Sequence, residues 1–88
     1  MSLYINNKWI DGSGDAMQSI NPATGEVLWE GAMASPGELS EAIAAGREAH
    51  YDWSKKTLDE RLVYLQKFTD LLTERKAEFA KLISDETG

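Results

Sequence analysis

The 88-residue sequence contains no cysteine and only one histidine, His50. Without cysteine, the chain can form no disulfide, no thiolate metal site and no cysteine nucleophile. A single histidine cannot build a metal site alone, because such a site needs several ligands. These absences remove thiol chemistry from the 88 residues, and we expect no metal site in them.

An excess of basic residues and a long apolar run are also missing. The formal net charge is −6, whereas binding to a nucleic-acid backbone needs a basic face. No apolar run approaches the ~20 residues that span a bilayer. Residues 1–4 form neither a basic leader nor an apolar signal core. We therefore expect no nucleic-acid partner, no membrane partner and a cytoplasmic location.

The residues that are present divide the chain near Ser35. Short β-prone runs and turn residues fill residues 1–34, and long helical patterns fill residues 35–88. The length allows one small domain, and 42% hydrophobic with 27% charged residues is ordinary for a soluble globular protein. The order of these patterns predicts an α+β fold, with two β-hairpins followed by two or three α-helices.

Two hairpins are expected in residues 1–34. In the first, residues 3–5 and 8–10 flank Asn6-Asn7, a pair that tolerates the positive φ of a tight turn. The second surrounds the stretch Asn21-Pro22-Ala23-Thr24-Gly25-Glu26, in which proline and glycine suit their turn positions. On its local sequence this stretch is a turn that carries no group for chemistry. Isolated hairpins are marginal in water, so both need a partner surface.

Both helical patterns begin with a capping box, in which Ser or Thr is followed three residues later by Glu. Ser35 and Glu38 form the first box, and Thr57 and Glu60 form the second. The first helix is predicted to end near Trp53, and its small residues favour the close approach of another element: Ala42, Ala45, Gly46 and Ala49. The second pattern is interrupted around residues 74–76, which predicts a bend that divides it into two helices.

The side chains that could do chemistry are explained more simply by structure. Carboxylates in or beside loops lack a pocket that would fix their separation: Asp11, Asp15, Glu26 and Glu30. Carboxylates on the helices suit capping, dipole and solvent positions: Glu38, Glu41, Glu48, Asp59 and Glu60. We therefore predict no catalytic, cofactor-binding or metal-binding residue in this chain.

The histidine, the tryptophans and one glycine pair have similar explanations. His50 is interpreted as a packed helix-end histidine. Gly12 and Gly14 form a G-x-G, but the third glycine and the helix of a dinucleotide fingerprint do not follow. The tryptophans are interpreted as anchors of a core or an interface: Trp9, Trp29 and Trp53.

Several blocks in fixed order carry a family resemblance: Tyr4 to Trp9, Asn21 to Val27, Ala42 to Trp53, Asp59 to Arg61, Asp70 to Glu78 and Asp85 to Gly88. As a set they resemble the N-terminus of the NAD(P)-dependent aldehyde dehydrogenase superfamily, over nearly the whole chain. Residues 27–31, Val-Leu-Trp-Glu-Gly, look most like the branch that oxidises N-succinylglutamate 5-semialdehyde in arginine catabolism.

The resemblance implies a parent enzyme that oxidises an aldehyde to the acid with NAD+. In such an enzyme a cysteine thiolate attacks the aldehyde, hydride passes to NAD+, and a glutamate-activated water hydrolyses the thioester. The family's residues for these steps and for the coenzyme lie downstream of Gly88, so none is carried onto this chain.

The resemblance also implies that residues 1–34 and 35–88 form one incomplete domain, part of the coenzyme-binding domain of a homo-oligomeric enzyme. The rest of that enzyme would be its partner, and the 88 residues alone would neither bind NAD nor oxidise the aldehyde substrate. The alternative is an independent small helical interaction module with no enzymatic activity. The two hypotheses differ in whether the encoding gene continues into a Rossmann-type domain with a cysteine nucleophile.

Overall fold

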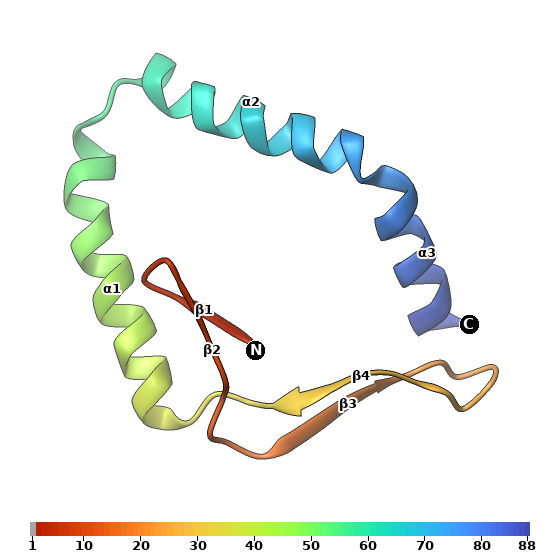
Figure 1. The fold of residues 1–88 in the computed structure, drawn as a ribbon. Coiled ribbons are helices and arrows are strands. Elements are labelled where there is room, and N and C mark those ends of the chain that lie inside the picture. Colours follow the sequence, from red (N-terminus) through yellow and green to blue (C-terminus); the bar gives the residue numbers. More distant parts are fainter. Residues whose placement is uncertain (1) are drawn as a thin grey trace.

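The computed structural model describes residues 2–88 and contains two antiparallel strand pairs followed by three helices (Figure 1). The predicted α+β class and the order of its elements are confirmed. The elements are β1 (Leu3–Ile5), β2 (Lys8–Ile10), β3 (Ala16–Ile20), β4 (Val27–Ala32), α1 (Pro36–Lys55), α2 (Leu58–Glu74) and α3 (Lys76–Thr87).

The first hairpin forms around the predicted asparagine turn. Asn6 and Asn7 have φ angles of 50° and 61°, the left-handed conformation that a two-residue hairpin turn requires. This turn sets a register in which Tyr4 lies opposite Trp9. Their ring centroids are 5.1 Å apart, within the range of favourable aromatic pairs.

The second hairpin turns at the stretch identified from the sequence. The backbone N–H of Asn21 donates to the carbonyl of Glu26 at 2.9 Å, and the N–H of Gly25 donates to the carbonyl of Asn21 at 2.8 Å. The Asn21 side chain accepts from the N–H of Ala23 at 2.9 Å. Gly25 has a φ of 76°, as a residue without Cβ readily adopts. The predicted turn is therefore confirmed.

The helices begin and bend where the sequence predicts. Both capping boxes are formed, each with its serine or threonine hydroxyl and its glutamate engaged. The first helix continues to Lys55, two residues beyond the predicted end at Trp53. Arg75 separates α2 from α3 with φ −99° and ψ 16°, outside helical geometry, so the interruption around residues 74–76 divides the pattern into two helices.

The elements outline a ring and enclose no core. Helices α1, α2 and α3 form an arc, the β1–β2 hairpin lies inside it, and the β3–β4 hairpin approaches the end of α3 (Figure 1). Among residues 2–88 no side chain is fully buried. The radius of gyration is 16.9 Å, against about 12 Å for a compact chain of this length. The residues therefore pack locally, element against neighbour, without a shared interior.

The solvent-accessible surface area also indicates that these residues pack without a shared interior. The accessible surface is 7441 Å², whereas a compact monomer of 9.8 kDa exposes about 5,200 Å². The excess of about 2,200 Å² per chain is as large as one side of an extensive permanent interface.

Candidate functional site: an uncovered apolar surface

Helix α2 carries an apolar face that runs along its length. At 3.6 residues per turn its members cover roughly half of the helix circumference. Their relative exposures lie between 40% and 64%. The members are Leu58, Leu62, Tyr64, Leu65, Phe68, Leu71 and Leu72.

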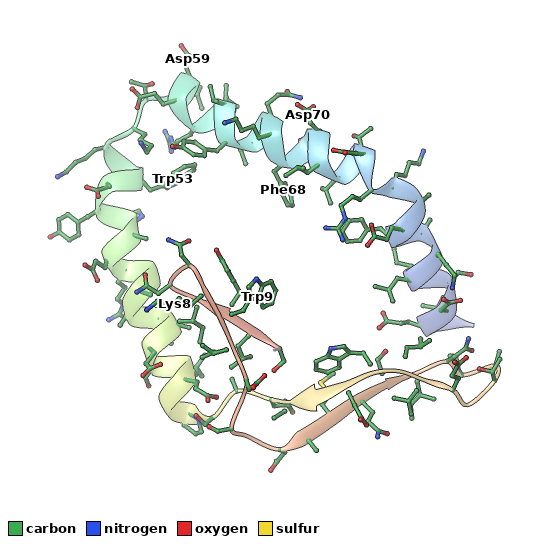
Figure 2. The ribbon with its side chains drawn as sticks, in the orientation of Figure 1. Lys8, Trp9, Trp53, Asp59, Phe68 and Asp70 are labelled. Atoms are coloured by element: carbon green, nitrogen blue, oxygen red, sulfur yellow. The ribbon has the colours of Figure 1, made fainter. Side chains whose placement is uncertain are left out.

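The orientation of this face is visible in Figure 2. Phe68 points into the ring opening, together with Trp9 from β2 and Trp53 from α1, while Asp59 and Asp70 point outward. A helix with one apolar and one charged side normally buries the apolar side against another element. The predicted role of Trp9 and Trp53 as anchors of a core or an interface fits this placement.

Where α1 ends and α2 begins, the two helices form an open groove of about 530 Å³. Trp53 and Tyr64 meet edge to face at its wall, with ring centroids 5.6 Å apart. The Nζ of Lys56 lies 5.7 Å from the Tyr64 ring centroid, a cation–π contact. His50 lines the groove and is exposed, so its interpretation as a packed histidine is wrong. The groove is lined mainly by apolar surface and suits an apolar occupant.

The small-residue face of α1 receives the β1–β2 hairpin. A shallow groove between them is lined by Tyr4 and Asn6 on one side and by Ala45 and Gly46 on the other. The expected approach of another element to this thin face is therefore confirmed. A Cβ added at Gly46 would meet nothing within 4 Å, so the tight packing expected at this glycine is not present.

One of the loop carboxylates, Glu30, lies in strand β4. Glu30 accepts a hydrogen bond from Gln18 Nε2 at 3.2 Å across the β3–β4 ladder. Across residues 2–88, no group of three or more His, Asp or Glu side chains is placed to hold a metal ion. In the same part of the chain, no helix combines the length and apolarity needed to cross a bilayer.

Gly12 and Gly14 serve close backbone packing. A Cβ at Gly12 would lie 2.3 Å from the carbonyl oxygen of Met33, and one at Gly14 would lie 2.7 Å from that of Ala34. The N–H of Gly14 donates to the Met33 carbonyl at 2.8 Å. The spacing of this pair was identified in the sequence, but the segment it packs against was not.

Glu38 makes contacts that its capping role did not reveal. The carboxylate accepts from the Ser35 N–H at 2.7 Å, as the capping box requires. It also accepts from Ser13, whose N–H lies at 3.2 Å and whose Oγ lies at 2.8 Å. The Ser35 N–H, followed by Ser13, lowers the pKa of this carboxyl below its ordinary value. No local sequence signal links Ser13 to Glu38, since they lie 25 positions apart.

The turn of the second hairpin meets the end of α3. Ser19 Oγ donates to Glu86 Oε1 at 2.6 Å. A Cβ at Gly88 would lie 3.3 Å from Pro22 Cγ, so the backbone there passes close to the proline ring. The turn therefore has a tertiary neighbour as well as its own geometry.

The residues present do not fit a nicotinamide coenzyme. A dinucleotide pyrophosphate needs a glycine-rich turn opening onto a free helix N-terminus. Here Gly12 and Gly14 face backbone carbonyls instead. The N-termini of α1 and α2 are each occupied by a glutamate carboxylate, which would repel a phosphate.

Comparison with known proteins supplies a family. The chain is 44% identical over 87 residues to the N-succinylglutamate 5-semialdehyde dehydrogenase of Chromobacterium violaceum, covering 99% of this chain and 18% of that protein. It is 41% identical over 86 residues to N-succinylglutamate 5-semialdehyde dehydrogenase 2 of Caulobacter vibrioides, covering 98% and 18%. The Pseudomonas fluorescens protein named N-succinylglutamate 5-semialdehyde dehydrogenase is 40% identical over 87 residues, covering 99% and 18%.

These matches agree with the resemblance seen in the sequence, including the branch indicated by residues 27–31. The chain spans less than a fifth of the length of these relatives, 18% in each case. Residues 9–88 also match the model of the Aldehyde dehydrogenase family. The chain therefore belongs to the aldehyde dehydrogenase family.

Proposed function

We propose that this chain is a non-catalytic segment of an enzyme that oxidises N-succinylglutamate 5-semialdehyde to the acid with NAD+, a step of arginine catabolism. The observation that carries the proposal is the 44% identity across 99% of the chain to a protein of that name. The same match covers only 18% of the relative. Most of the enzyme's residues, among them those that act on substrate, would then lie outside this segment.

The segment's contribution in this proposal is structural. Residues 1–34 and 35–88 together form one incomplete domain, and the remainder of the same enzyme completes it. Supporting this, the apolar face of α2 is exposed and the chain carries about 2,200 Å² of surface beyond that of a compact monomer. The Nε of Arg61 is also buried without a hydrogen-bond partner within residues 2–88, and such groups normally find one.

In this proposal, the oxidation of the aldehyde is carried out by residues in the remainder of the enzyme. A bound nicotinamide coenzyme accepts the hydride in this class of oxidation. No residue of this chain is given a step, because it has no cysteine nucleophile and the N-termini of α1 and α2 are each occupied by a glutamate carboxylate. A cytoplasmic homo-oligomer is the proposed form of the whole enzyme. An independent interaction module is disfavoured by the family membership.

A segment exchange tests this function. In the Chromobacterium violaceum enzyme, the 87 matched residues are replaced by those of this chain. Oxidation of N-succinylglutamate 5-semialdehyde is then measured with NAD+ and with NADP+, with betaine aldehyde as the comparison substrate. We expect the exchanged enzyme to keep kcat/KM within about tenfold of the original, because the match runs over 99% of this chain and no residue of the segment is assigned a chemical step.

Two controls complete the test. The same enzyme without the segment should be inactive, because the surface that the segment covers would be exposed. The 88-residue chain alone should oxidise no aldehyde. Activity of the isolated chain, or an exchanged enzyme that does not fold or is inactive, would contradict the proposal.

A further inference from the structure

We propose that Glu38 is a positioning residue that fixes the strand-bearing segment 1–34 against the first helix, in addition to capping that helix. This role goes beyond the proposed function, since it concerns how two parts of this chain are held together.

The Glu38 carboxylate accepts hydrogen bonds both from the N-cap residue of α1 and from the loop that contains Ser13. Oε2 accepts the N–H of Ser35 at 2.7 Å and that of Ser13 at 3.2 Å. Oε1 accepts the hydroxyl of Ser13 at 2.8 Å. Both oxygens are therefore used, and two of the three donors come from the loop that precedes β3. One side chain joins this loop to the N-terminus of α1.

Backbone contacts hold the same loop in place for Ser13. The N–H of Gly14 donates to the carbonyl of Met33, and the N–H of Met33 donates to the carbonyl of Asp15, each at 2.8 Å. Gly12 lies against the Met33 carbonyl, so closely that a Cβ would not fit. The two bonds hold the residues after Ser13, and the close contact at Gly12 holds the residue before it. Ser13 can therefore reach Glu38 with little further loss of chain entropy.

The second helix provides an internal comparison. Glu60 completes the same capping box, with its carboxylate accepting from the Thr57 N–H at 3.2 Å. The described contacts of Glu60 stay within its own helix start. Glu38 and Glu60 thus share the capping role, and the bond to a distant loop distinguishes Glu38.

The test compares Glu38→Gln with Glu60→Gln in the segment-exchanged enzyme described above, because the isolated chain is expected to self-associate or rearrange its strands. Glutamine still completes a capping box, but it replaces one anionic oxygen with a neutral NH2 group. The charge-assisted bond from the Ser13 hydroxyl is then replaced at best by a weaker neutral bond in which the NH2 group donates to Ser13 Oγ. Amide hydrogen exchange is measured by mass spectrometry on peptides that contain Ser13, Gly14 and Met33. We expect exchange at Ser13, Gly14 and Met33 to rise about tenfold or more in Glu38→Gln, and to stay unchanged in Glu60→Gln.

A second variant separates the two tasks of the carboxylate. Ser13→Ala removes the hydroxyl bond and leaves the capping box of α1 intact. It should reproduce the faster exchange at Gly14 and Met33 while the first turn of α1 keeps its protection. Equal exchange in the two glutamine variants, or normal loop protection in Ser13→Ala, would overturn the proposal. Global loss of protection in Glu38→Gln without any loop effect in Ser13→Ala would overturn it as well.

Discussion

Ser19 donates a hydrogen bond of 2.6 Å from its Oγ to Oε1 of Glu86, joining two residues that lie 67 positions apart in the sequence. The bond links β3 to the last turn of α3 and closes the ring outlined by the elements (Figure 1). Both residues lie near the surface, and exposed polar contacts of this kind contribute little individually. This hydrogen bond therefore contributes little to holding β3 against the end of α3.

A double-mutant cycle measures this link. Ser19→Ala and Glu86→Ala should each speed amide exchange in the last turn of α3, and the double variant should be no faster than either. The coupling free energy should not exceed about 1 kcal/mol. Gln18→Ala is the matched control, because neighbouring strand residues point to opposite faces. Additive effects of Ser19 and Glu86 would mean that the bond does not form.

The apolar face of α2 should matter only in the whole enzyme. Phe68→Ala in the exchanged enzyme should lower the free energy of unfolding by about 3–5 kcal/mol, the usual cost for a buried phenylalanine. The same change in the isolated chain should cost much less, since Phe68 is 60% exposed there. Chemical denaturation of both forms provides the comparison.

Asp70→Ala is the control for that comparison. Asp70 points outward from the same helix (Figure 2), and surface changes of this kind are usually within about 0.5 kcal/mol. If Phe68→Ala were as mild as Asp70→Ala in the enzyme, the face would not be buried there.

The isolated chain should self-associate or rearrange its strands. Many of its large apolar side chains are exposed, among them those of the apolar face of α2, and clustered exposed apolar side chains mark interaction surfaces. A second copy is one way to cover such a surface. Size-exclusion chromatography with light scattering over a range of concentrations checks this. A sharp monomer peak at the highest concentration would refute it.

Stability should depend on pH through Glu38. Its carboxyl pKa is lowered from 4.5, mainly by the hydrogen bond from the Ser35 backbone and then by Ser13. A lowered folded-state pKa means that the contribution is present above the unfolded-state pKa and is lost as pH falls through the folded-state value. Thermal unfolding between neutral and acidic pH should show this loss, and Glu38→Gln should weaken it. An NMR titration of the Glu38 carboxyl carbon gives its direct pKa.

Two glycines should respond oppositely to alanine. Gly46 lies inside α1 with nothing within 4 Å of an added Cβ, so Gly46→Ala should stabilise the isolated chain by up to about 1 kcal/mol. Gly12→Ala would place its Cβ 2.3 Å from the Met33 carbonyl oxygen and should be destabilising. Helix content and unfolding midpoints from circular dichroism distinguish them. A neutral Gly12→Ala would show that the loop moves away from Met33 without cost.

Features that depend on neighbouring residues were predictable from the sequence. The asparagine turn, the Pro22 turn and both capping boxes are specified by residues within a few positions of one another. The links from Ser13 to Glu38 and from Ser19 to Glu86 were not, because they depend on how distant elements meet in space.

Two interpretations from the sequence are wrong because they placed packed neighbours against residues of the first helix. His50 was interpreted as packed, and Gly46 was explained by a tight neighbour, because helices with apolar faces usually bury them. In the structure of residues 2–88, His50 is exposed, and a Cβ added at Gly46 would meet no atom within 4 Å. The absence of a catalytic constellation stays a prediction, since it concerns what these residues do in the whole enzyme.

The exposed face of α2 has a consequence for how this sequence can change over evolutionary time. In a protein with its own core, a smaller side chain at one position can be compensated by a larger one beside it. Leu65 is 54% exposed, so its packing neighbours would belong to the surface that the segment covers. We expect substitutions on α2 to covary with positions far outside the matched 18% of the relatives, and only weakly with one another.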